Sequence, residues 1–292
     1  MTYINFFGLN IEIINIVLFF PLLVSFLIYD KSPKYMSLGL ISLSIVIAFG
    51  AGYVDVLSSI ALLLFGAICY FFSITKNNAY KIATGVLIFF MTIVLMTHML
   101  TGISNPKIFD NYVFSDNAIS FTKYLNVDKA IAGLFLLLYV VPKPKKVNYE
   151  NSIIGVLVAT LVTSISLLSA VLIGMVEIDT KLTFLVIPWA ITNLFLTCYT
   201  EEAFFRGFIQ TQTANVLKHN KFNNVVAVFV SGTLFGLVHL SAGFAYTAIA
   251  TLLGCSFAYI YYKTKNIYWP IFAHFIFNLS HFILFTYPYI KR

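Results

Sequence analysis

The chain has 292 residues, of which 60% are apolar, 17% are aromatic and only 10% are charged. A soluble domain carries roughly 25% charged residues, so this chain has too little charge to cover a water-facing surface. We therefore predict an integral membrane protein. The net charge of +7 does not predict a nucleic-acid partner, because the lysines lie in short gaps between apolar runs and form no phosphate-binding stripe.

Apolar segments follow one another along the whole chain, and many are near the ~20 residues that a helix needs to cross a bilayer. Ten such segments are predicted, at 11–29, 36–53, 57–75, 80–99, 128–142, 151–177, 182–206, 223–241, 244–262 and 269–289. This pattern predicts an all-α fold, a polytopic membrane helix bundle with about 8–10 transmembrane helices.

A lysine-rich stretch from Val141 to Lys146 is the predicted boundary between two halves, because its two prolines interrupt any helix. We expect accessory transmembrane helices in residues 1–148 and the functional core in residues 149–292. No internal sequence repeat relates the two halves.

The positions of the basic residues predict the orientation in the membrane. If the N-terminus is outside, the inner loops hold eleven lysines and the outer side holds six basic residues, Arg292 among them. The inner clusters are Lys31/Lys34, Lys76/Lys81, Lys143/Lys145/Lys146, Lys218/Lys221 and Lys263/Lys265. Inner loops of membrane proteins carry an excess of lysine and arginine, so we expect the N-terminus outside.

Two adjacent acids lie inside an apolar segment, Glu201 and Glu202, and Arg206 follows them. Charged groups in a bilayer cost several kcal/mol and therefore mark candidate functional sites. Glu202 and Arg206 are four residues apart and can pair on one helix face. Glu201 is rotated by about 100° from Glu202 and cannot share that pair. Such a pair can also be a purely structural tie.

The last predicted helices carry further polar side chains at helical spacing. His274 and Asn278 are four residues apart, and Phe235 and His239 repeat that spacing. Glu201 and His239 are each nineteen residues from position 220, so a helical hairpin would place them at equal height. His274 reaches the same level only if the polar tip of that hairpin, from residue 210 to residue 224, projects well beyond the membrane.

This set of side chains can perform peptide hydrolysis. A buried carboxylate such as Glu201, assisted by an imidazole, can act as a general base on water. His274 and Asn278 can donate hydrogen bonds to an oxyanion. Alternatively, Glu201, His239 and His274 could ligate a divalent metal such as zinc. The absence of a His-Glu-x-x-His helix from the sequence favours a metal-free site, but both options stay open.

Three short motifs resemble those of a known family, the CPBP intramembrane proteases, which include the type II CAAX prenyl endopeptidases and bacteriocin-processing or self-immunity proteins. The sequences EEAFFR at 201–206, FGLVH at 235–239 and HFIFN at 274–278 are similar to that family's EExxxR, FxxxH and HxxxN motifs, in the same order. The resemblance covers roughly 185–285 and identifies residues 149–292 as a protease-like core.

The resemblance implies a role for each motif residue. Glu201 would activate the water, and His239 would help to position it. The oxyanion would be bound by His274 and Asn278. Structural support of the site would come from Glu202, Arg206 and Phe235.

By this resemblance the chain is an intramembrane endopeptidase that cleaves a membrane-associated or lipid-anchored peptide or protein. We expect it in the cytoplasmic membrane of a bacterium, with its active site opening to the cytoplasm near the lysine-rich turns. Two alternatives remain, a non-catalytic immunity or scaffold protein of the same fold and a small proton-coupled transporter. The lack of internal repeats counts against the transporter. Loss of peptide cleavage in Glu201→Ala would separate the protease from both.

Overall fold

The computed structural model describes residues 3–6, 9–146 and 149–291. This part of the chain is mostly helical and contains two small two-stranded sheets, which confirms the predicted all-α polytopic bundle. Arg292, counted above among the outer charges, and residue 148, the predicted end of the first domain, lie outside the described residues.

A helix lies within or across every predicted apolar segment. Within the described residues, α3 (Val56–Ile74), α4 (Asn78–Met96), α6 (Tyr149–Leu172) and α11 (Phe244–Thr264) are long and apolar enough to cross a membrane. Shorter apolar helices are α1 (Ile13–Ile28), α2 (Lys34–Gly50) and α10 (Asn223–Leu237). The predicted total of 8–10 transmembrane helices stays a prediction.

The chain forms two compact units. The N-terminal unit contains Met1–Asp110, Thr122–Val141 and Phe195–Thr200, and the C-terminal unit contains Asn111–Phe121, Pro142–Leu194 and Glu201–Arg292. The assignment of accessory and functional roles to residues 1–148 and 149–292 stays a prediction.

The N-terminal unit is built around α5 (Val127–Tyr139), which contacts α1, α3 and α4 and is buried along nearly its whole length. Before α1, β1 (Tyr3–Phe6) pairs antiparallel with β2 (Leu9–Glu12), with Tyr3 opposite Glu12. The second sheet contains β3 (Lys107–Tyr112) and β4 (Phe121–Tyr124).

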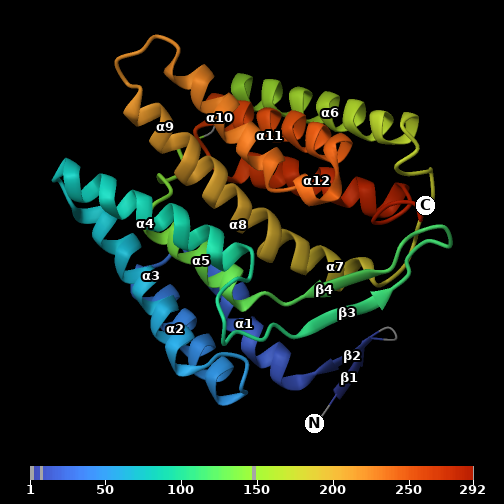
Figure 1. Cartoon of the computed structure of the whole chain (residues 1–292), viewed down its shortest axis with the longest axis horizontal. Coiled ribbons are helices and arrows are strands. Elements are labelled where there is room, and N and C mark those ends of the chain that lie inside the picture. The colour runs from blue at the N-terminus through green and yellow to red at the C-terminus, as the bar shows by residue number, and fades with distance from the viewer. Residues whose placement is uncertain (1–2, 7–8, 147–148, 292) are drawn as a thin grey trace. The chain divides into compact units, whose positions relative to one another are not determined.

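The C-terminal unit is a bundle in which α11 contacts α6, α10 and α12 (Tyr268–Leu284), as Figure 1 shows. Glycines allow the close approach of α10 and α11. A Cβ atom at Gly254 would lie 2.8 Å from the carbonyl oxygen of Gly232, too close for any larger residue without movement of the backbone. This contact fixes the helix that carries Phe235.

A continuous helical rod carries the two adjacent glutamates. Its parts are α7 (Val186–Asn193), a π-helix (Leu194–Cys198), α8 (Tyr199–Glu202), a second π-helix (Ala203–Gln210) and α9 (Thr211–Val216). The predicted segment 182–206 therefore continues to Val216, because the polar residues after Gln210 stay helical. The short turn from 217 to 222 then leads into α10.

The two ends of the C-terminal unit are held by different contacts. At one end, which we call the basic end, the Lys145 backbone N–H donates to the Lys265 carbonyl and Asn266 Nδ2 donates to the Lys145 carbonyl. At the opposite end, the Thr286 N–H donates to the Glu177 carbonyl and the Ile290 N–H donates to the Met175 carbonyl. Helices α6, α10 and α12 begin at the basic end, and α11 begins at the opposite end.

Candidate active site

Glu201 and Glu202 lie in α8, a single helical turn between the two π-helical segments. Short π-helical stretches are rare and occur frequently at functional sites. Glu202 is fully buried and Glu201 is 9% exposed. Buried carboxylates are costly unless other groups compensate them, so the neighbours of these two side chains define the site.

The predicted pair between Glu202 and Arg206 is present. Arg206 Nε lies 3.0 Å from Glu202 Oε2, and neither side chain is exposed. Arg206 Nη2 also donates a hydrogen bond of 2.9 Å to the carbonyl oxygen of Gly254 in α11. The guanidinium therefore connects the helical rod to the neighbouring helix.

Three phenylalanine rings surround the guanidinium of Arg206. The Phe235 ring centroid is 4.7 Å from Arg206 Cζ, and those of Phe257 and Phe205 are 5.5 and 5.7 Å away. A cation over an aromatic face in a dry site is stabilised by about 2 kcal/mol. The Phe235 ring also lies 5.5 Å from the His274 ring and 5.2 Å from the His239 ring, so Phe235 contacts three of the predicted site residues.

His274 contacts both glutamates. Its Nδ1 lies 2.9 Å from Glu202 Oε1, and its Nε2 lies 4.0 Å from Glu201 Oε2. The first distance is a hydrogen bond and the second is too long for one. A carboxylate only accepts hydrogen bonds, so we assign the hydrogen of this contact to Nδ1. This leaves Nε2 as the atom of His274 that faces Glu201.

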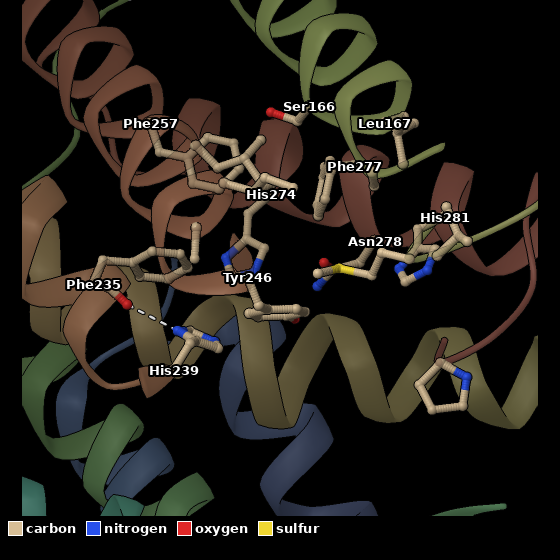
Figure 2. Close-up of a pocket in the computed structure, with 17 residues that line it drawn as sticks. Ser166, Leu167, Phe235, His239, Tyr246, Phe257, His274, Phe277, Asn278 and His281 are labelled. Carbon is tan, nitrogen blue, oxygen red and sulfur yellow. Dashed lines mark hydrogen bonds between the residues drawn. The ribbon is translucent and has the colours of Figure 1, made fainter. Parts of the chain in front are cut away.

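His239 lies just beyond the C-terminal end of α10. Its Nδ1 is 2.8 Å from the carbonyl oxygen of Phe235, the contact drawn as a dashed line in Figure 2. A carbonyl oxygen can only accept, so we assign the hydrogen to Nδ1 here as well. The His239 ring also lies near Tyr246 of α11, with ring centroids 5.6 Å apart.

Asn278 is held by a residue that sequence reasoning missed. Asn278 Nδ2 donates a 3.1 Å hydrogen bond to Oδ1 of Asn193, a buried residue of α7. The signal that could have found Asn193 is a polar amide within an otherwise apolar predicted segment. Tyr246 was also missed, because the sequence contains 18 tyrosines and nothing in the spacing distinguishes this one.

A small cavity of about 60 Å³ joins several of these residues. Its lining includes Phe235, His239, His274 and Asn278, together with Tyr246 and His281, as Figure 2 shows. The structure thus brings residues from the second and third motifs to one cavity. Glu201 and Glu202 do not line this cavity, but both lie next to His274, which does. A cavity of this size holds a few water molecules and is too small for a peptide.

The arrangement does not fit a zinc site. No group of three or more His, Cys, Asp or Glu side chains in the described part of the chain is arranged to hold a metal ion. Glu201, His239 and His274 are not gathered as such a group in the described residues, and we derive no step through a metal. Whether the protein uses a metal stays a prediction.

Comparisons with known proteins agree with the motif resemblance. Residues 183–280, which contain all three motifs, match the family described as Type II CAAX prenyl endopeptidase Rce1-like. The Bacillus subtilis (strain 168) protein named "Putative membrane peptidase YdiL" is 38% identical over 60 residues. That match covers 20% of this chain and 24% of the relative. No solved structure matches the chain. The predicted resemblance is confirmed for this segment.

Proposed function

Because residues 183–280 match the type II CAAX prenyl endopeptidases, we propose that this integral membrane protein is an intramembrane protease. It hydrolyses a peptide bond of a membrane-associated or lipid-anchored peptide or protein, with a water molecule activated by Glu201. The observation that carries this proposal is the position of His274 between two buried glutamates, 2.9 Å from Glu202 and 4.0 Å from Glu201. We place the protein in the cytoplasmic membrane of a bacterium.

In this proposal both ring nitrogens of His274 carry a hydrogen in the reacting state. Nδ1–H is directed to Glu202 Oε1, and Nε2–H is directed toward Glu201 and the cavity.

The reaction follows from these positions. A water molecule beside Glu201 gives one proton to the carboxylate as its oxygen bonds to the carbonyl carbon of the substrate. The carbonyl oxygen becomes an oxyanion, which accepts hydrogen bonds from His274 Nε2 and Asn278 Nδ2. Glu201 then gives its proton to the amide nitrogen as the C–N bond breaks. The products are a carboxylic acid and an amine.

Asn193 and His239 complete this assignment as positioning residues. The Asn278 amide nitrogen carries two hydrogens, and the bond to Asn193 Oδ1 fixes the direction in which the second points. His239, with its Nδ1 on the Phe235 carbonyl, turns Nε2 toward the cavity and can accept a hydrogen bond from the attacking water.

The test compares the peptides of membranes that contain the wild-type protein, Glu201→Gln or Glu150→Gln. Glu150 is an exposed acid at the start of α6, so its variant is a matched control. We expect a processed peptide that is present with the wild type and with Glu150→Gln and absent with Glu201→Gln. Identical peptides in all three membranes, with equal amounts of folded protein, would contradict the proposal and favour a scaffold or transporter.

A further inference from the structure

The cavity occupies one half of the C-terminal unit. Its lining comes from the C-terminal half of α6, which contributes Ser166, and from the C-terminal ends of α10 and α12, which contribute His239 and His281. From α11 it takes the N-terminal part, beginning at Tyr246. Because α6, α10 and α12 begin at the basic end and α11 begins at the opposite end, these residues lie toward the opposite end. Two other lining residues, Phe257 and His274, lie nearer the middle of their helices and form the inner part of the cavity.

A larger cleft adjoins the cavity at the opposite end. It has a volume of about 410 Å³, within the range of ligand-binding sites. Its lining is mostly apolar and includes Ile173, Met175, Phe244, Tyr246, Tyr289 and Ile290. Met175 and Tyr246 also line the cavity, and the Tyr246 ring packs against His239. The cleft therefore leads directly to a predicted site residue.

A second groove is a poorer entrance. It runs between α6 and α12, has a volume of about 500 Å³ and shares only Leu167 with the cavity. Its lining includes none of the residues of the three motifs that contact the cavity. The cleft, which shares Met175 and Tyr246 with the cavity, is therefore the better entrance.

The excess of lysines at the basic end indicates that this end faces the cytoplasm. It carries Lys143, Lys145, Lys146, Lys218, Lys221, Lys263 and Lys265. The described residues of the opposite end carry Lys181 and Lys291, together with the acids Glu177 and Asp179. Short loops rich in lysine stay in the cytoplasm, so the cleft is on the extracytoplasmic side.

We propose that the active site opens through this cleft to the extracytoplasmic side of the membrane. Its substrate is a peptide that presents an apolar stretch on that side, such as an exported or outer-leaflet-anchored chain. That the peptide is cleaved rests on the proposed function. The side of the opening rests on the lining of the cavity and cleft and on the positions of the lysines. It differs from the cytoplasmic opening expected from the sequence, which no observation so far tests.

The test is thiol labelling, which does not depend on activity. Single cysteines are placed at Lys218, Ser241 and Ile249 in a chain whose Cys69, Cys198 and Cys255 are replaced by serine or alanine. Lys218 is at the basic end, Ser241 is in the turn between α10 and α11, and Ile249 lines the cavity. A membrane-impermeant maleimide is applied to intact cells and to inside-out vesicles.

We expect Ser241→Cys and Ile249→Cys to react in intact cells and Lys218→Cys to react only in inside-out vesicles. Reaction of Ile249→Cys only from the face that labels Lys218→Cys, or from neither face, would overturn the proposed opening. Peptide cleavage by the cysteine-free parent is measured in parallel. Expected labelling without cleavage would contradict the proposed function and leave the opening intact, so the two failures are distinguishable.

Discussion

Glu202 Oε1 accepts a hydrogen bond from His274 Nδ1 over 2.9 Å, although the two residues are 72 positions apart in the sequence. This bond joins the helix of the first motif to the helix of the third. It means that Glu202 has two partners, Arg206 and His274, and that a change at Glu202 affects both the stability of the bundle and the orientation of an imidazole.

The first prediction concerns Glu202→Gln. Removing this charge leaves Arg206 buried without a carboxylate, and breaking a buried pair costs on the order of 3–5 kcal/mol. We expect a lower Tm in detergent and a lower yield in the membrane than for the wild type. The control is Glu150→Gln, which should unfold at the wild-type temperature. An unchanged Tm for Glu202→Gln would show that Arg206 does not need this partner.

The second prediction separates the two roles of Glu202. In the double variant Glu202→Met/Arg206→Met neither charge is left unpaired, so we expect a Tm well above that of Glu202→Gln. Peptide cleavage should nevertheless stay low, because His274 has lost the acceptor that orients its Nδ1. A double variant that cleaves at the wild-type rate would mean that the bond between Glu202 and His274 has no part in the reaction.

The third prediction concerns Asn193. If Asn193 orients the amide of Asn278, Asn193→Ala should lower kcat by about tenfold and leave KM unchanged, as expected for one hydrogen bond of about 1–1.5 kcal/mol that acts in the transition state. The loss should be smaller when Asn278 is already alanine, because the two residues act as a pair.

The neighbouring Thr192 provides the control for this measurement. Its hydroxyl bonds to carbonyl groups of its own helix, so Thr192→Val should change Tm more than kcat. Equal and additive losses from Asn193→Ala and Asn278→Ala would argue that Asn193 only contributes to folding.

The fourth prediction concerns metal. Because the described residues hold no cluster of three or more potential ligands, we expect less than one zinc ion per purified chain. Activity should survive a strong chelator. Metal analysis that finds one tightly bound ion per chain, with activity restored by that ion alone, would reverse this assignment.

Much of the fold could be predicted from the sequence because the bilayer requires long apolar helices. Each apolar run corresponds to a helix for that reason, and the four-residue spacing of Glu202 and Arg206 identified their pair. The apolar segment 182–206 ends before the helix does, since the polar residues up to Val216 stay helical. A helical hairpin through residue 220, considered from the sequence, allows for this extension.

Contacts between helices could not be read from spacing. The bond from His274 to Glu202 and the bond from Asn278 to Asn193 depend on how closely the helices pack, and this closeness depends on glycines such as Gly254. The π-helical segments around α8 were also missed, because an inserted residue changes the helix register without a signature in composition.

The most direct test of the account is the rate at which purified protein in lipid vesicles cleaves the peptide identified from membranes. We predict that Glu201→Gln lowers this rate by about 10²–10⁴-fold, the usual contribution of a general base, while its Tm stays that of the wild type. A Glu201→Gln protein that is folded and cleaves the peptide at the wild-type rate would contradict the assignment of Glu201 as the group that activates water.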